Sequence, residues 1–214
     1  SVQATHLGQA LRPARSVLVA ASLALLASTG CLERHQGSGQ KVTVIGDSIT
    51  SDAQVQVRSA LSGTSRSVNG SDGIDLAAAR AQLIQPAAQT GSKIVVIELG
   101  INSAREIWNS ADLPHLENAL HDLDAVPCVI WVTPTALEPS YYDHLGNGTI
   151  HSRIQQFKAS LVKRLPKHPN QRLADWGAAE RLQPSWYAAD HLHNSSAGMA
   201  AYAKYVKAQV DQGC

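Results

Sequence analysis

Aromatic residues are scarce in this sequence: they make up 5% of the 214 residues, and phenylalanine occurs once. A platform that stacks nucleic-acid bases needs several aromatic side chains, so that class of function is excluded. An excess of one charge is also missing, because 18 lysines and arginines face 17 aspartates and glutamates, for a net charge of +1. The chain therefore lacks the basic surface that nucleic acid or an anionic membrane would attract.

Cysteine is rare as well. Three cysteines are too few to build a scaffold from disulfides. Hydrophobic residues make up 44% of the chain and charged residues 16%, which excludes a disordered protein. A chain of this length can bury a sizeable core without metals or crosslinks. We therefore expect a single domain behind any leader.

The first thirty residues are typical of a targeting segment. Arg12 and Arg15 precede an apolar run over residues 16–27, which is too short to span a bilayer comfortably and fits the core of a signal peptide. Small residues stand directly before Cys31, as in bacterial lipoprotein signals, where the cysteine becomes the lipidated first residue. Two alternatives stay open: an ordinary secretory signal with Cys31 incidental, and a buried core helix.

We therefore expect a signal peptide over residues 1–30, a polar tether over 31–40 and one domain over 41–214. This organisation predicts an exported protein. It would be held in the cell envelope by lipid on Cys31, or secreted.

From residue 41 onward, β-branched runs alternate with segments of helical periodicity. Strands are predicted over residues 41–45, 65–68, 93–99, 128–132 and 172–176, and helices over 53–61, 75–85, 112–124, 150–165 and 195–210. The second of these helices is expected to end before Pro86. Strands separated by helices indicate a parallel sheet of about five strands with helices on both faces. Ligands bind such sheets at the carboxyl ends of the strands.

The cysteines allow two outcomes. If Cys31 carries lipid, Cys128 and Cys214 remain as an even pair, and in an oxidising compartment they could form a disulfide that ties down the C-terminus. The alternative is a buried Cys128 in a strand and a free Cys214.

Two loops that follow predicted strands carry polar residues suited to catalysis. Ser48 comes just after the first strand, where the unpaired N–H groups at the start of a helix can assist a serine nucleophile. The alternative is that Ser48 or Thr50 only caps that helix. Asn102 follows the third strand, and its amide can donate to a developing negative charge. Asparagine is also a common turn residue.

A third loop, just before the last helix, contains Asp190, His191 and His193. A carboxylate three residues ahead of an imidazole can hold the ring by Nδ1–H, which leaves Nε2 to take a proton from a serine. These residues could instead bind a metal, but that site would need a further ligand that the sequence does not supply. A helix cap is the remaining alternative.

Together these loops resemble the sequence blocks of the SGNH hydrolases, also called GDSL esterases. The first block is similar to Gly46-Asp47-Ser48-Ile49, with isoleucine in place of leucine. The third is matched by Gly100-Ile101-Asn102, with Ser103 where the family has aspartate. The fifth, Asp-x-x-His, is matched by Asp190 and His193. The blocks occur in the family's order and span nearly the whole predicted domain.

This resemblance implies a three-layer α/β/α, flavodoxin-like fold and a catalytic triad. Ser48 would be the nucleophile, His193 the general base and Asp190 the group that orients His193. Asp47 is not a member of this triad, and we expect it to brace the loop. The resemblance implies no metal and no organic cofactor.

The resemblance also implies an oxyanion hole. Its donors would be the backbone N–H groups of Ser48 and Gly73 and the side chain of Asn102. Gly70 is an alternative to Gly73, which we favour because it stands just ahead of the predicted 75–85 helix.

The functional hypothesis is a serine esterase that removes short acyl groups, such as acetyl, from a cell-envelope glycan or glycolipid. Acyl transfer to a sugar hydroxyl would use the same residues and remains an alternative. A non-catalytic envelope-binding lipoprotein is a third hypothesis, left open only by Ser103. The expected partners are an acyl ester and its glycan, with no nucleic acid and no membrane contact except through lipid on Cys31.

Two aromatic segments lie near the predicted site. The segment 141–148 could line a substrate cleft or be an ordinary surface loop. Trp186 and Tyr187, just ahead of Asp190, could form a sugar-stacking wall or simply pack against the domain.

Overall fold

The computed structural model describes residues 39–106 and 108–214. The predicted signal peptide, Cys31 and nearly all of the tether lie outside the described residues. Among the described residues, no helix combines the length and the apolar character that a membrane-spanning segment needs.

Five parallel strands form one sheet in the order β2-β1-β3-β4-β5. The strands are β1 Lys41–Gly46, β2 Ser65–Gly70, β3 Ile94–Glu98, β4 Cys128–Val132 and β5 Gln171–Ala174. The predicted parallel sheet of about five strands is confirmed. The predicted 128–132 strand has the observed bounds, and the ends of the other four differ by one or two residues. The last strand ends at Ala174 because Trp176 begins a helix.

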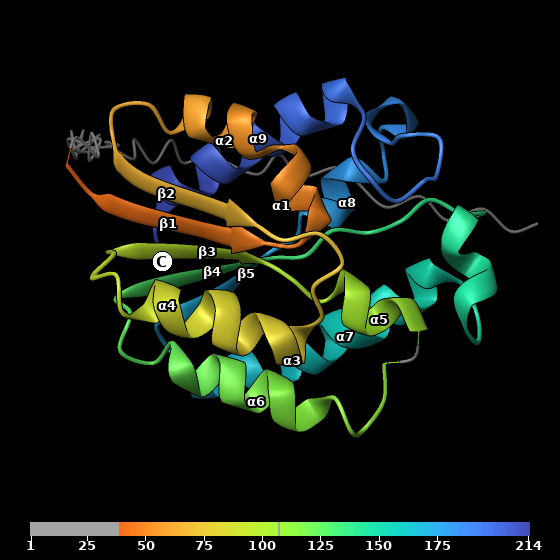
Figure 1. The fold of residues 1–214 in the computed structure, drawn as a ribbon, viewed down its shortest axis with the longest axis horizontal. Coiled ribbons are helices and arrows are strands. Elements are labelled where there is room, and N and C mark those ends of the chain that lie inside the picture. The colour runs from red at the N-terminus through yellow and green to blue at the C-terminus, as the bar shows by residue number, and fades with distance from the viewer. Residues whose placement is uncertain (1–38, 107) are drawn as a thin grey trace, which may run out of the picture. The chain divides into compact units, whose positions relative to one another are not determined.

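Helices cover both faces of this sheet, so the predicted three-layer α/β/α fold is confirmed (Figure 1). One face carries α1 Ser48–Asp52, α2 Gln54–Ala60, α8 Trp176–Glu180 and α9 Ser196–Gln212. The other carries α3 Leu76–Ala79, α4 Gln85–Ala88, α5 Ile101–Glu106, α6 Leu113–Asp122 and α7 Ile150–Arg164. Short 3₁₀ turns occur at η2 Tyr141–Leu145, η3 Leu165–Lys167 and η4 Pro184–Trp186.

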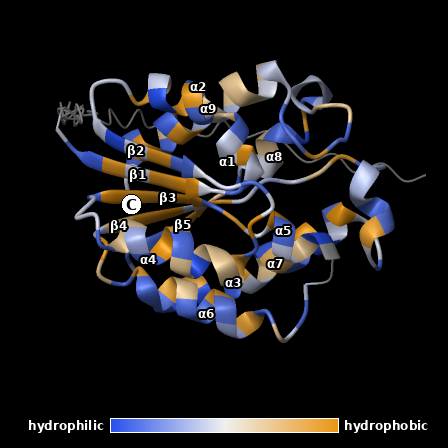
Figure 2. Ribbon diagram, in the orientation of Figure 1, coloured by the Kyte–Doolittle hydropathy of each residue, from blue (hydrophilic) through white to orange (hydrophobic). Residues whose placement is uncertain are grey.

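Because helices cover both faces of the sheet, its central strands form the core of the domain. Every residue of β3 and of β4 is buried, and both strands are largely orange in Figure 2, whereas the edge strand β2 is not. Strands that are covered on both faces need a continuous apolar run rather than an alternating one. This is why the apolar runs of the sequence locate the strands so well.

The helix predicted to stop before Pro86 runs past it. A π-helical turn, η1 Arg80–Ile84, joins α3 to α4, and Pro86 lies in the first turn of α4. Proline lacks the N–H that a regular α-helix would use at this point, and the shifted hydrogen bonds of a π turn accommodate the missing donor. The predicted helix end before Pro86 was therefore wrong, because the π-helical turn lets the helix continue through the proline.

A disulfide links Cys128, the first residue of β4, to Cys214, with 5.5 Å between their Cα atoms. The first of the two predicted outcomes for these cysteines is the one in the structure. The link fastens the end of the chain after α9 to the amino end of the sheet. It closes a sequence separation of 86 residues, which restricts the unfolded chain strongly.

Replacing Cys214 by serine should therefore destabilise the domain. The expected loss is about 2–4 kcal/mol in the free energy of unfolding, measured by urea denaturation of the oxidised protein. Reduction of the unchanged protein should lower its stability to that of Cys214→Ser, and the variant should not respond to reductant. An unfolding midpoint that neither the substitution nor reduction changes would contradict the link.

Candidate active site

Three polar side chains from distant segments form a hydrogen-bonded chain at the carboxyl end of the sheet. Ser48 Oγ lies 2.8 Å from His193 Nε2, and His193 Nδ1 lies 2.6 Å from Asp190 Oδ2. A carboxylate can only accept, so Nδ1 carries the proton and Nε2 is free to accept from the serine hydroxyl. The structure thus brings together the three residues proposed from the sequence, in the geometry of a nucleophile and its base.

The loop that carries the acid is held by its own backbone. Asp190 Oδ1 accepts the N–H groups of Leu192 and His193, both at 3.0 Å. Burial would raise the pKa of Asp190, but the bonds from the His193 side chain and from these N–H groups bring it below its usual value. His191 has a positive φ of 60° at the turn, and its Nδ1 lies 2.6 Å from the carbonyl oxygen of Pro139. The side chain of His191 therefore contacts the segment at Pro139 and is no part of the hydrogen-bonded chain of Ser48, His193 and Asp190.

Groups that can donate hydrogen bonds lie beside Ser48. Ser48 is the first residue of α1, where a helix leaves its N–H groups without internal partners. Asn102 Nδ2 is buried and has no hydrogen-bond partner among the described residues. Ser48, Gly73, Asn102 and His193 all line one cavity of about 350 Å³.

The two candidate glycines differ in position. Gly73 has a positive φ of 70° and lies in the turn before α3, at the wall of the cavity. Gly70 ends β2, and a Cβ on it would collide with the backbone of Ser51. Gly70 is therefore needed for the close packing of α1 on β2, and Gly73 is the glycine that faces the site.

A second, larger cavity adjoins the first. It measures about 610 Å³ and shares Gly73, Asn102 and Arg105 with the smaller one. Its remaining lining is mostly polar and includes Asp112 and His115. The serine therefore lies at one end of an open polar cleft.

One residue that shapes this cleft was expected from the sequence, in the segment 141–148 that could line it, and another, Arg153, was not. Tyr142, in the predicted loop 141–148, lines the smaller cavity, and its ring centroid lies 6.0 Å from that of His193. Arg153 is buried in α7 and donates to the carbonyl groups of Ala104, at 3.0 Å, and Tyr142, at 3.2 Å. One guanidinium thus fastens both α5 and the Tyr142 segment, and a lone arginine in a helical pattern gives no signal of such a role.

The other aromatic segment packs against the domain. Trp186 stacks on Trp176 with 5.2 Å between the ring centroids and an interplanar angle of 5°, and Tyr187 is buried. Neither Trp186 nor Tyr187 lines the two cavities beside Ser48.

The sequence matches no family model and no curated protein sequence, but its structure has clear neighbours. The lipase/acylhydrolase from Enterococcus faecalis has a TM-score of 0.65 and 21% identity, over 81% of this chain and 96% of that one. The C-terminal catalytic domain of the Streptococcus pneumoniae peptidoglycan O-acetyltransferase has a TM-score of 0.60 and 21% identity, over 82% and 93%. An acetylxylan esterase from Geobacillus stearothermophilus has 0.55 and 21%, over 79% and 93%.

The chain has the SGNH-hydrolase fold.

Its departure from the third SGNH block has a structural explanation. Ser103 Oγ accepts the backbone N–H of Leu76 at 2.9 Å. Leu76 opens α3 just after the Gly73 turn, and Ser103 is the neighbour of Asn102 in α5. The serine therefore ties together the two segments that carry the candidate oxyanion donors, although it lacks the carboxylate found in the family.

Asp47, directly before Ser48, and Glu98, the last residue of β3, both have carboxyl groups with no exposed surface. Asp47 Oδ1 accepts the N–H of Ile49 at 3.2 Å and so caps α1, and Glu98 Oε2 accepts the hydroxyl of Thr50 at 3.2 Å. No N–H or O–H group of the described residues reaches Asp47 Oδ2 or Glu98 Oε1.

A proton shared between these two carboxyl groups explains the arrangement. Burial raises the pKa of Asp47 to about 6. Burial, the charge of Asp47 and the hydrogen bond to it raise the pKa of Glu98 well above its usual value. We therefore predict that the folded protein keeps a proton on Glu98 that the unfolded chain would release, and that this proton supports Asp47 in the turn that presents Ser48.

This pair predicts a pH effect on stability that Glu98→Gln should reduce. The folded state keeps protons that the unfolded chain releases above pH 4.5, the ordinary pKa of glutamate. The stability that these protons provide is therefore complete below that pH and is lost as the pH rises through the raised pKa values. Glutamine donates to Asp47 at every pH, so the variant should lose less stability between pH 4.5 and neutrality.

Urea denaturation at a series of pH values measures the difference between the two proteins. Glu138→Gln, at an exposed glutamate, is the matched control and should keep the unchanged protein's pH dependence. Equal pH dependence in Glu98→Gln and the unchanged protein would rule out a protonated Glu98.

Proposed function

We propose that this chain is a serine esterase that removes short acyl groups, acetyl above all, from a glycan or glycolipid of the cell envelope. One observation carries the proposal: Ser48, His193 and Asp190 form a hydrogen-bonded chain at a cavity that Gly73 and Asn102 also line. A serine with a free base and with donors for an oxyanion is equipped for acyl transfer.

In the proposed reaction, Ser48 Oγ attacks the ester carbonyl while its proton passes to His193 Nε2. Asp190 stabilises the resulting imidazolium through Nδ1–H. The carbonyl oxygen becomes an oxyanion, held by the N–H groups of Ser48 and Gly73 and by Asn102 Nδ2. His193 then protonates the leaving alkoxide, and water attacks the acyl-enzyme by the reverse sequence of proton transfers.

The shape and the polarity of the cleft support a small acyl group on a hydrophilic alcohol. The cavity at Ser48 is about 350 Å³ and includes Asp52, Asp72 and Arg105 in its lining. A long alkyl chain would have to desolvate these charges, whereas sugar hydroxyls can hydrogen-bond to them. The adjoining cavity of about 610 Å³ offers room for the glycan that carries the ester.

Two structural neighbours favour this substrate class by analogy. One is named as a peptidoglycan O-acetyltransferase and another as an acetylxylan esterase. Both names describe acetyl groups on sugar polymers. Because identity is 21% in each case, we carry over only the substrate class, as part of the proposal.

Export is also part of the proposal. The apolar run over residues 16–27 and the small residues before Cys31 support a cleaved leader. The Cys128–Cys214 disulfide supports an oxidising compartment. We propose that the mature protein acts outside the cytoplasm, secreted or anchored by lipid on Cys31.

The esterase proposal predicts serine-dependent release of p-nitrophenol from p-nitrophenyl esters, fastest for acetate and slower for longer chains. Ser48→Ala should fall to nearly the uncatalysed rate, because no other hydroxyl is in contact with His193 Nε2 in the described residues. Ser51→Ala, on the same helix and outside the cavity, is the matched control and should keep its activity. Ester hydrolysis that persists in Ser48→Ala would remove Ser48 as the nucleophile.

The acyltransferase alternative shares the acyl-enzyme and differs only in what accepts the acyl group. One neighbour, the O-acetyltransferase domain, gives it specific support. The same assay with added oligosaccharides and mass spectrometry distinguishes the two functions. Acylated sugar formed at the expense of free acetate would identify a transferase, and acetate alone would identify a hydrolase.

Removal of one oxyanion donor should slow the chemical step without weakening substrate binding. For Asn102→Ala we expect kcat to fall about 10²–10³-fold with little change in KM, because this donor acts mainly on the transition state. Asn69→Ala, at an exposed asparagine of β2, should leave kcat unchanged. A KM effect with normal kcat would show that Asn102 binds substrate and does not stabilise the oxyanion.

A further inference from the structure

A second cluster of chemically competent side chains lies at the other end of the sheet. Glu117 and His121 project from the last turns of α6, and His168 comes from the segment between η3 and β5. One ligand atom of each residue lies within 4.8 Å of the others. This cluster precedes β5, whereas Ser48 follows β1, so it is separate from the esterase site.

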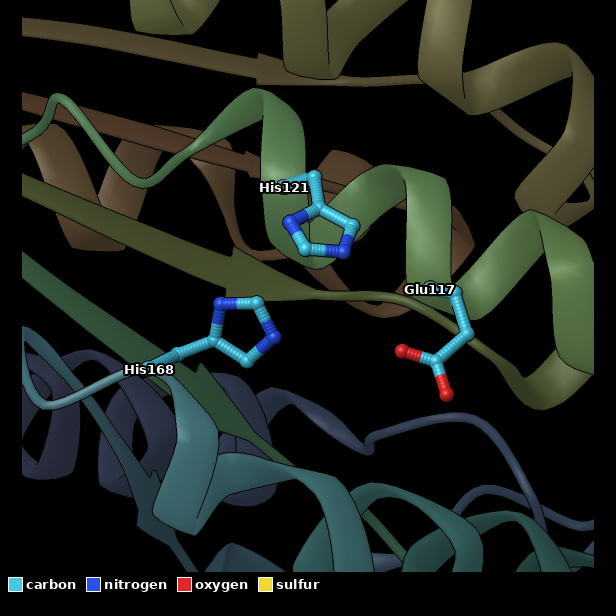
Figure 3. Close-up of side chains that lie close together, drawn as sticks. All are labelled: Glu117, His121 and His168. Carbon is cyan, nitrogen blue, oxygen red and sulfur yellow. The ribbon is translucent and has the colours of Figure 1, made fainter.

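Asp124 fixes both imidazole rings of this cluster. Its Oδ1 lies 2.6 Å from His168 Nδ1, and its Oδ2 lies 3.1 Å from His121 Nδ1. A carboxylate can only accept, so each ring donates through Nδ1 and keeps a lone pair on Nε2. Figure 3 shows that the second nitrogen of each ring lies on the side of Glu117. In metal sites, a ligating histidine usually donates its other ring N–H to a carboxylate or a carbonyl group.

His168 carries the strongest sign of a missing partner. Its side chain is 2% exposed, and Nε2 is buried without a hydrogen-bond partner among the described residues. An unpaired buried nitrogen is unfavourable, because it has lost water and gained nothing in return. The lone pair of His168 Nε2 therefore accepts no hydrogen bond from the described residues.

Glu117 supplies the anionic donor. Its Oε1 accepts from Arg164 Nε at 2.7 Å, which leaves Oε2 for a further partner. Ligating carboxylates are commonly held in this way by a second hydrogen bond. The two carboxylates, Glu117 and Asp124, outweigh the single guanidinium of Arg164, so the local charge favours a cation.

We propose that Glu117, His121 and His168 form a binding site for a divalent transition-metal ion, with Zn²⁺ the best match to their donors. Two imidazole nitrogens and one carboxylate are a ligand set that zinc accepts, with further positions open to water. His121 is 66% and Glu117 35% exposed in their side chains, so both can move the short distance toward the buried His168. The ion would join the end of α6 to the segment that leads into β5.

Isothermal titration of the untagged protein with zinc chloride tests the site. We expect one ion per chain and a higher unfolding temperature in the presence of zinc. His121→Ala removes an exposed ligand at little risk to folding, and we expect it to weaken binding at least tenfold and to abolish the thermal shift. His115→Ala, at an exposed histidine of the same helix outside the cluster, should bind as the unchanged protein does.

Two further measurements separate a built site from accidental binding. Asp124→Asn leaves all three ligands in place and should weaken binding by roughly 10–100-fold, as expected for loss of the group that orients them. Esterase activity should be the same for His121→Ala and the unchanged protein, since the cluster lies at the opposite end of the sheet from Ser48. No saturable zinc uptake by the unchanged protein, or uptake that His121→Ala leaves intact, would overturn the proposal.

Discussion

The hydrogen bond between Ser48 and His193 joins residues that stand 145 positions apart in the chain, and the parallel sheet makes it possible. Parallel strands bring their carboxyl ends to one edge, so the loops after β1 and β3 and the loop before α9 meet there. The sheet in turn depends on apolar strands that are buried on both faces. The chemistry of this protein is therefore a consequence of which residues stand directly after each apolar run.

Much of the fold and the central part of the site could be predicted from sequence, because both rest on local patterns. Buried strands are apolar runs. Short motifs in the loops identified the site residues, which are Ser48, Asn102, Asp190 and His193. What could not be predicted depends on contacts between distant segments. The buried Arg153 fastens two walls of the cleft, and the helix runs through Pro86 because a π turn precedes it.

Ser103 and Glu98 show how a site can depend on residues that take no part in the reaction. Ser103 breaks the family's block, and from sequence this departure left a non-catalytic protein open. In the structure its hydroxyl accepts the N–H of Leu76 and so links the start of α3 to α5 without a charge. Glu98 is the only charged residue in the apolar strand β3, and burial together with the charge of Asp47 raises its pKa well above the usual value. The pH experiment on Glu98→Gln tests whether this carboxyl group is uncharged and supports Asp47 in the turn that carries Ser48.

The two ends of the sheet each carry a histidine held by a carboxylate: His193 at the carboxyl end and His168 at the amino end. The two histidines differ in what Nε2 contacts. In both places a carboxylate binds Nδ1 of histidine and leaves Nε2 as the reactive atom. At the carboxyl end Nε2 meets a hydroxyl, so the lone pair takes a proton. At the amino end Nε2 of His168 meets no donor in the described residues. Under the two proposals made above, the same arrangement of carboxylate and imidazole provides a general base where a hydroxyl is present and a metal ligand where none is.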